Sequence, residues 1–169
     1  MKNFIFIFGG IRSGKSSYSV RLAKKLSKKV IFIATANASD EEMKKRIKLH
    51  KSSRPKFWKT IEENENVTEA LESIENKYEV IIIDCLGLLV SNLLLKKLKD
   101  TEIIKKIKKL ADVISKNKQT IILVSNDVGS SLVPDNLLGR RFVDLIGFAN
   151  QLMAKKANEV IFMRAGIAT

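Results

Sequence analysis

The apolar and polar residues of the chain divide it into short apolar runs separated by longer amphipathic segments. Five runs are nearly continuous in apolar residues and rich in β-branched types: residues 3–8, 30–34, 79–84, 119–125 and 159–164. Strands without polar alternation are typical of a sheet that is covered on both faces. The runs therefore predict the strands of a buried sheet, and residues 57–61 predict a further strand at its edge.

Helical periodicity fills the segments between these runs. The pattern predicts helices over residues 16–28, from Ser39 to about residue 52, along the stripes of residues 67–74 and 103–114, and from Pro134-Asp135 to about Lys156. Ser39 and Glu42 have the spacing of a capping box. Strands that alternate with helices indicate parallel β-α units. We see no repeat or linker, so residues 1–169 are predicted to form a single α/β domain.

A phosphate-binding motif follows the first predicted strand. The sequence GGIRSGKS fits the pattern G-x-x-x-x-G-K-[ST] of a P-loop, and it comprises Gly9, Gly10, Ile11, Arg12, Ser13, Gly14, Lys15 and Ser16. Glycines let consecutive backbone N–H groups point at phosphate oxygens, and the next helix directs its positive end to the same place. We expect Lys15 to reach the β- and γ-phosphates and the Ser16 hydroxyl to bind Mg²⁺.

Asp84 ends the apolar run 79–84. An aspartate at the end of a buried strand in a P-loop protein has the Walker B arrangement, which holds Mg²⁺. A simple strand-end or helix-capping role is the alternative. With the P-loop present, the sequence favours the metal contact.

His50 is the only histidine of the chain and is flanked by Arg46 and Arg54, each four residues away. If the helix extends far enough, the three side chains share one face. Imidazole serves well as a nucleophile or proton carrier near neutral pH, and guanidinium groups bind phosphate oxygens in pairs. Periodicity alone favours a solvated surface histidine over a catalytic one.

Composition limits the classes of protein that fit. Hydrophobic residues make up 45% of the 169 residues and charged residues 29%, values typical of a soluble globular protein. No apolar stretch has the length of a membrane helix or the features of a signal peptide. The single cysteine fits a reducing cytoplasm. The net charge of +13 comes from lysines spread over nearly every predicted helix, which favours solvated helix faces over a nucleic-acid site.

Beyond the P-loop, the chain resembles a family of bifunctional enzymes of cobalamin biosynthesis, adenosylcobinamide kinase/adenosylcobinamide-phosphate guanylyltransferase. The resemblance extends over almost the whole chain. Its matching segments are residues 9–16, 33–36, 40–43, 46–50, 54–55, Trp58, 62–63, 84–86, 91–94, 124–129, 133–134, 140–142, Asp144, Gly147, 150–151 and Ala154.

The resemblance implies two reactions. ATP or GTP phosphorylates the hydroxyl of the aminopropanol arm of adenosylcobinamide, and GMP from GTP is then transferred by way of a histidine to give adenosyl-GDP-cobinamide. His50 matches the position of that histidine. The resemblance also implies a RecA-like P-loop fold with a mostly parallel sheet and an antiparallel edge, and a homo-oligomer that is a trimer. The further implied nucleotide contacts are Ala34, Thr35, Ala36, Lys51, Ser52, Ser53, Arg54, Glu62 and Asp84.

Three positions depart from the family pattern. Asp127 stands where glutamate is usual, Gly87 where threonine or serine is common, and Val143 where arginine is common. None belongs to the P-loop or is adjacent to His50, so we expect guanylylation to be unaffected. If one of these positions serves the corrinoid substrate or the kinase step, the departure would weaken that half of the activity.

Two other functions compete with this one. A small-molecule P-loop kinase of other specificity would use no covalent intermediate. A nucleic-acid-binding P-loop ATPase would use the net charge and would show salt-dependent affinity for DNA or RNA.

Overall fold

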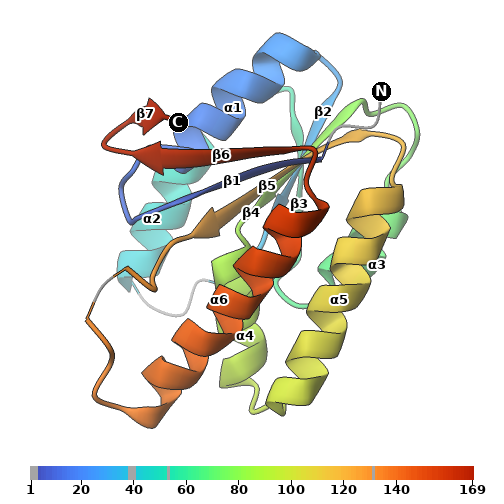
Figure 1. Cartoon of the computed structure of the whole chain (residues 1–169). Helices are drawn as coiled ribbons and strands as arrows, with labels where there is room; N and C mark the ends of the chain where they lie inside the picture. The colour runs from blue at the N-terminus through green and yellow to red at the C-terminus, as the bar shows by residue number, and fades with distance from the viewer. Residues whose placement is uncertain (1–3, 38–40, 53, 131) are drawn as a thin grey trace.

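The computed structural model describes residues 4–37, 41–52, 54–130 and 132–169, and these contain a seven-stranded sheet between two layers of helices (Figure 1). The strands are β1 (Phe4–Gly9), β2 (Val30–Ala34), β3 (Lys59–Glu62), β4 (Val80–Asp84), β5 (Thr120–Asn126), β6 (Glu159–Arg164) and β7 (Ile167–Ala168). Their order is β3-β2-β4-β5-β1-β6-β7. Neighbouring strands are parallel except β6 and β7, which confirms a mostly parallel sheet with an antiparallel edge.

The helices are α1 (Lys15–Leu26), α2 (Glu41–Ser52), α3 (Val67–Glu72), α4 (Leu86–Leu95), α5 (Asp100–Lys116) and α6 (Leu137–Lys156). Five of them occupy segments where the sequence predicts helices. α6 begins later than Pro134-Asp135, because Asn136 caps it by accepting a hydrogen bond from the Gly139 backbone N–H at 2.7 Å. The predicted capping residue Ser39 lies outside the described residues.

α4 is the helix that the sequence did not predict. Most of its residues are apolar, and six of the ten are buried: Leu86, Gly87, Leu89, Val90, Leu93 and Leu94. A helix that is apolar on nearly all sides has little periodic contrast between its faces. It therefore gives no amphipathic signal, although its length exceeds that of a typical buried strand.

The sheet separates two hydrophobic cores. Alternate residues of β1 point to opposite faces, so that Phe4 and Phe6 enter the core under α3, α4, α5 and α6, while Ile5 and Ile7 enter the core that includes Trp58 and the buried side of α1. Full burial of such a side chain stabilises the fold by about 1.5–3 kcal/mol. The two cores explain why the strand sequences show no polar alternation.

The segments that follow β1, β2, β4 and β5 lie together at one edge of the sheet. The carboxyl ends of β1, β2, β4 and β5 lie at the same edge, because these strands are parallel. α1 covers one face after β1, whereas α4 and α6 pack on the other. In α/β proteins, ligands bind at the carboxyl ends of the strands, at the point where connections leave the sheet toward opposite faces.

Within the described part of the chain, no helix is both long enough and apolar enough to cross a membrane.

Candidate nucleotide-binding site

The P-loop, residues 9–16, forms the turn between β1 and α1 and requires glycine at two points. A Cβ atom on Gly9 would lie 2.2 Å from the backbone oxygen of Met163 in β6, where neither strand has room to move. Gly14 is the residue before α1 and has a φ of 92°, a left-handed conformation that favours glycine. The turn and the start of the helix thus follow from the motif itself.

Lys15 is buried in this loop, with 7% of its surface exposed. Its Nζ donates to the Gly10 backbone oxygen at 2.6 Å and lies 3.5 Å from the Ser13 hydroxyl oxygen. Burial lowers the pKa of Lys15 below its ordinary value, and the charges of Asp84 and Asp127 oppose that shift. The ammonium group is therefore a desolvated cation held by neutral oxygens, for which phosphate oxygens are stronger partners.

A cavity of about 780 Å³ opens beside the P-loop. Its size falls in the range of small-molecule sites. The predicted nucleotide-binding and catalytic residues that line it are Ile11, Arg12, Ser13, Gly14, Lys15, Ser16, Ala34, Ala36, His50, Lys51, Arg54, Glu62 and Asp84. The structure thus brings residues from the first loop, from α2 and from three strand ends to one hollow.

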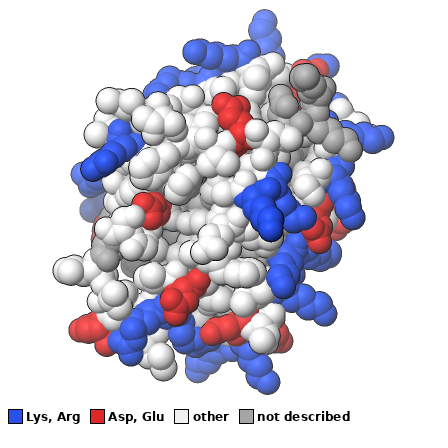
Figure 2. All heavy atoms as spheres, viewed as in Figure 1, with Lys and Arg blue, Asp and Glu red and all other residues white. Residues whose placement is uncertain are grey.

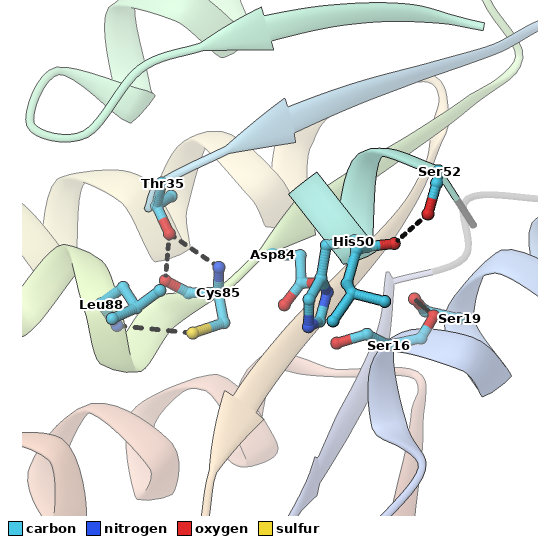
Figure 3. Close-up of polar contacts among 9 residues, drawn as sticks. Ser16, Ser19, Thr35, His50, Ser52, Asp84, Cys85 and Leu88 are labelled. Atoms are coloured by element: carbon cyan, nitrogen blue, oxygen red, sulfur yellow. Dashed lines mark hydrogen bonds and ion pairs between the residues drawn. The ribbon is translucent and has the colours of Figure 1, made fainter. Parts of the chain in front are cut away.

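His50 lies over this cavity next to Asp84 (Figure 3). The imidazole Nδ1 is 3.9 Å from Asp84 Oδ2, and the two side chains are 50% and 11% exposed, respectively. The ring is thus accessible from the cavity yet adjacent to the aspartate at the end of β4. The imidazole and the carboxylate at the end of β4 therefore face the same cavity.

The expected helical face of His50 and its two flanking arginines is only partly present. α2 ends at Ser52, so Arg54 belongs to the following segment rather than to the helix. The side chain of Arg46 lies outside the described residues. Arg54 nevertheless reaches the cavity, because the chain turns back toward β3 after the helix.

Arg54 presents an unused hydrogen-bond donor. Its guanidinium carbon lies 3.6 Å from the centre of the Phe32 ring, and its Nη1 is buried and has no partner among the described residues. Burial lowers the pKa of Arg54, opposed by the charges of Asp84 and Glu62. A buried unpaired donor is costly unless a ligand oxygen satisfies it. Nearby, Lys51 forms an ion pair with Glu62.

Several implied nucleotide contacts do not line the cavity. Thr35 is fully buried and its hydroxyl is used by the backbone of Cys85. The Ser52 hydroxyl donates to the Leu49 backbone oxygen at 2.8 Å, within its own helix. Ser53 lies outside the described residues. Gly9 and Gly10 shape the loop through their backbone rather than line the hollow.

The cavity also includes residues that were not predicted as nucleotide contacts: Ser17, Asn37, Met43, Ile47, Glu63, Asn64, Cys85, Leu88 and Asn126. Some of them were foreseeable, since Asn126 follows a predicted strand at the edge where ligands bind. Cys85 is no candidate nucleophile, because burial raises the pKa of its thiol to about 12. Its sulfur instead accepts a hydrogen bond from the Leu88 N–H at the start of α4.

The donor set fits magnesium bound together with phosphate. Ser16 and Asp84 supply a hydroxyl and a carboxylate to the same cavity, and both are oxygen ligands of the kind Mg²⁺ prefers. Among the described residues, no group of three or more His, Cys, Asp or Glu side chains is placed to hold a metal ion. In nucleotide sites Mg²⁺ is commonly held by one or two side chains together with substrate phosphates and water.

Two of the three departures from the family pattern lie near the site. A Cβ atom on Gly87 would lie 3.2 Å from the Asn126 amide nitrogen, so the glycine gives Asn126 room beside the cavity. Asp127 accepts a hydrogen bond from the Ser130 hydroxyl at 2.9 Å, and its backbone N–H donates to Gly9. Nothing in the structure explains Val143.

The P-loop, the acidic strand end and the strand order define a RecA-like P-loop nucleotide-binding protein. Solved structures share this fold. One solved ATPase domain superposes with a TM-score of 0.51 at 14% identity, over 95% of this chain and 69% of that one. The RadB recombinase has a TM-score of 0.51 at 12% identity, over 95% of this chain and 73% of its own. At such low identity the likeness shows the fold alone.

The chain belongs to the cobinamide kinase/cobinamide phosphate guanyltransferase family, whose model matches residues 5–169. It is 34% identical to the bifunctional adenosylcobalamin biosynthesis protein CobU of Escherichia coli, over 96% of both chains. It is 38% identical to the protein CobP of the same description from Pseudomonas aeruginosa, over 95% of this chain and 92% of the relative. The family resemblance in the sequence is thereby confirmed.

Proposed function

We propose that this protein phosphorylates adenosylcobinamide with ATP or GTP and then transfers GMP from GTP to the product, by way of His50. The observation that supports it most is the imidazole beside Asp84, open to the cavity that the P-loop lines. Family membership supports the corrinoid as substrate. A corrinoid is larger than a nucleotide, so only its aminopropanol arm would enter the cavity.

In the guanylylation step, an imidazole nitrogen of His50 attacks the α-phosphorus of GTP. A nitrogen–phosphorus bond forms, the bond from the α-phosphorus to the bridging oxygen breaks, and pyrophosphate leaves. A phosphate oxygen of adenosylcobinamide phosphate then attacks the same phosphorus. The nitrogen–phosphorus bond breaks, the His50 imidazole is regenerated, and adenosyl-GDP-cobinamide forms. Dividing the transfer in two lets one site use two acceptors in turn.

The other residues of the cavity would bind and orient the substrates. Lys15 and the P-loop N–H groups bind the β- and γ-phosphates, and Arg54 donates to a phosphate oxygen through its unpaired Nη1. Glu62, once released from Lys51, accepts from the guanine edge or a ribose hydroxyl. Ser16 and Asp84 would hold Mg²⁺, which would neutralise negative charge on the phosphates.

A product assay tests the two activities. With adenosylcobinamide, GTP and Mg²⁺, we expect mass spectrometry to detect adenosylcobinamide phosphate first and adenosyl-GDP-cobinamide later. Without the corrinoid, we expect release of about one pyrophosphate per enzyme chain, because the GMP then has no acceptor. Phosphorylated corrinoid without any GDP product would leave only the kinase, and turnover of neither substrate would refute the proposal.

We also propose that the protein is a cytoplasmic homotrimer. Exposed apolar side chains after β5 and at the start of α6, among them Leu132, Val133 and Leu137, are of the kind that subunit contacts cover. Sedimentation equilibrium should then give three times the chain mass of 19.0 kDa. A monomer mass at micromolar concentration would contradict this assembly.

A further inference from the structure

Thr35 follows β2 at the same edge of the sheet as Asp84, but it does not face the cavity. The last residue of β2, Ala34, is paired with Asp84 in β4. Thr35 itself is 0% exposed. A polar side chain buried to this degree must satisfy its hydrogen bonds within the protein.

All the polar groups of Thr35 are hydrogen-bonded, and most of their partners lie at the end of β4. Its hydroxyl donates to the Cys85 backbone oxygen at 2.8 Å and accepts from the Cys85 backbone N–H at 2.7 Å. Its own N–H donates to the Asp84 backbone oxygen at 3.1 Å. Figure 3 shows the hydroxyl bridging both backbone groups of Cys85, next to the Asp84 carboxylate.

We call the hydrogen bonds that join Thr35 to the backbone of Asp84 and Cys85 the clamp. A second set of contacts, from α4, supports it. The Asn92 side chain donates to the Thr35 backbone oxygen and to the Asn64 backbone oxygen, at 2.9 Å each. The clamp and this support therefore join the end of β2, the end of β4, the segment after β3 and α4. The hydrogen bonds of the clamp hold the peptide group that follows the Asp84 Cα atom, and the pairing of β4 with β2 and β5 holds the chain before it, so that the direction of the Asp84 Cα–Cβ bond is fixed.

We infer that Thr35 is a positioning residue that orients the Asp84 carboxylate toward the place where Mg²⁺ would bind. Thr35 acts through the backbone of Cys85 and does not contact the nucleotide. The inference rests on the proposed binding of Mg²⁺ by Asp84. Only a hydroxyl can donate to a carbonyl and accept from an N–H at one atom. Outer contacts of this kind set the orientation of a metal ligand, and their loss commonly lowers affinity about 10- to 100-fold.

The test compares the affinity for a fluorescent GTP analogue in Mg²⁺ with that in EDTA. The Thr35→Val variant keeps the shape of the side chain but loses the hydroxyl. We expect the gain in affinity from Mg²⁺ to fall by roughly tenfold, with the affinity in EDTA unchanged. Thr35→Ser, which keeps the hydroxyl, should restore the wild-type gain.

Other outcomes would overturn the inference. Equal losses in Mg²⁺ and in EDTA would mean that Thr35 contacts the nucleotide directly. A lowered melting temperature with an unchanged gain from Mg²⁺ would mean a structural role alone. If Thr35→Val does not fold, Asn92→Leu removes the support from α4 without touching the hydroxyl. It should then reduce the same gain to a smaller extent, and an unchanged gain would refute the clamp.

An Asp84→Asn variant separates this inference from the proposed function. If Asp84→Asn leaves the gain from Mg²⁺ intact, the proposed metal role of Asp84 is wrong. If Asp84→Asn removes the gain and Thr35→Val does not, the metal role stands and the inference about Thr35 fails. If both hold, adding Thr35→Val to Asp84→Asn should cause no further loss, because both changes act on the same ligand.

Discussion

Replacing His50 with alanine should abolish labelling of the protein by α-labelled GTP, a loss of about 10³-fold or more, because the nucleophile itself is removed. The wild-type label should be labile in acid and stable in alkali, as expected of a nitrogen–phosphorus bond. The P-loop is untouched, so phosphorylation of adenosylcobinamide should continue at a rate within about threefold of the wild type. Autoradiography of the separated protein measures the first effect and the product assay the second.

Lys48→Ala is the matched control for that experiment. Lys48 lies two residues before His50 on α2, is exposed and does not line the cavity. Its replacement changes the same helix on a face that does not line the cavity, and should leave labelling at the wild-type level. Label retained by His50→Ala would show that another residue carries GMP. Loss of both activities with normal GTP affinity would instead give His50 a role in the kinase step.

The fold was predictable wherever local pattern and tertiary environment agree. The strands of a sheet covered on both faces are apolar where they cross the core, and residues 80–83 and 121–124 are so in the sequence and buried in the structure. The sequence pattern did not predict α4, because a buried helix lacks the polar face that gives helices their amphipathic periodicity.

The P-loop was predictable because its chemistry is local in sequence. The spacing from Gly9 to Ser16 fixes the turn, and the glycine requirements at Gly9 and Gly14 follow from the close approach to β6 and from a left-handed residue. Asp84 was predictable in the same way from its place at a strand end. The motif and the strand-end aspartate can be recognised without knowledge of distant segments, although the contact between Gly9 and β6 cannot.

The partners of His50 and Thr35 could not be predicted in that way. The proximity of the imidazole to Asp84, a residue far along the chain, depends on how α2 crosses the carboxyl edge of the sheet. Periodicity gave His50 no special status, and only the family resemblance pointed to it. The burial of Thr35 depends on the end of β4 and on α4, a helix that the sequence pattern did not predict.

Lys15 is the residue whose loss should affect both reactions most. The residue is 7% exposed, and its ammonium group donates hydrogen bonds to the Gly10 backbone oxygen and the Ser13 hydroxyl oxygen of the loop. Both proposed reactions develop negative charge on phosphate oxygens that this cation would contact. Removing one such preorganised donor typically costs about 10²–10³-fold in rate.

We therefore expect Lys15→Met to lower the rates of corrinoid phosphorylation and of guanylylation by about 10²–10³-fold each. The melting temperature should not fall, because burial already disfavours the charged form of Lys15 and methionine fills similar space without a charge. Lys25→Met, at an exposed position of the same helix, is the control and should behave as wild type. If Lys15→Met lost only one reaction, the two steps would not share the phosphate site at the P-loop, and the proposal of a single cavity serving both would be wrong.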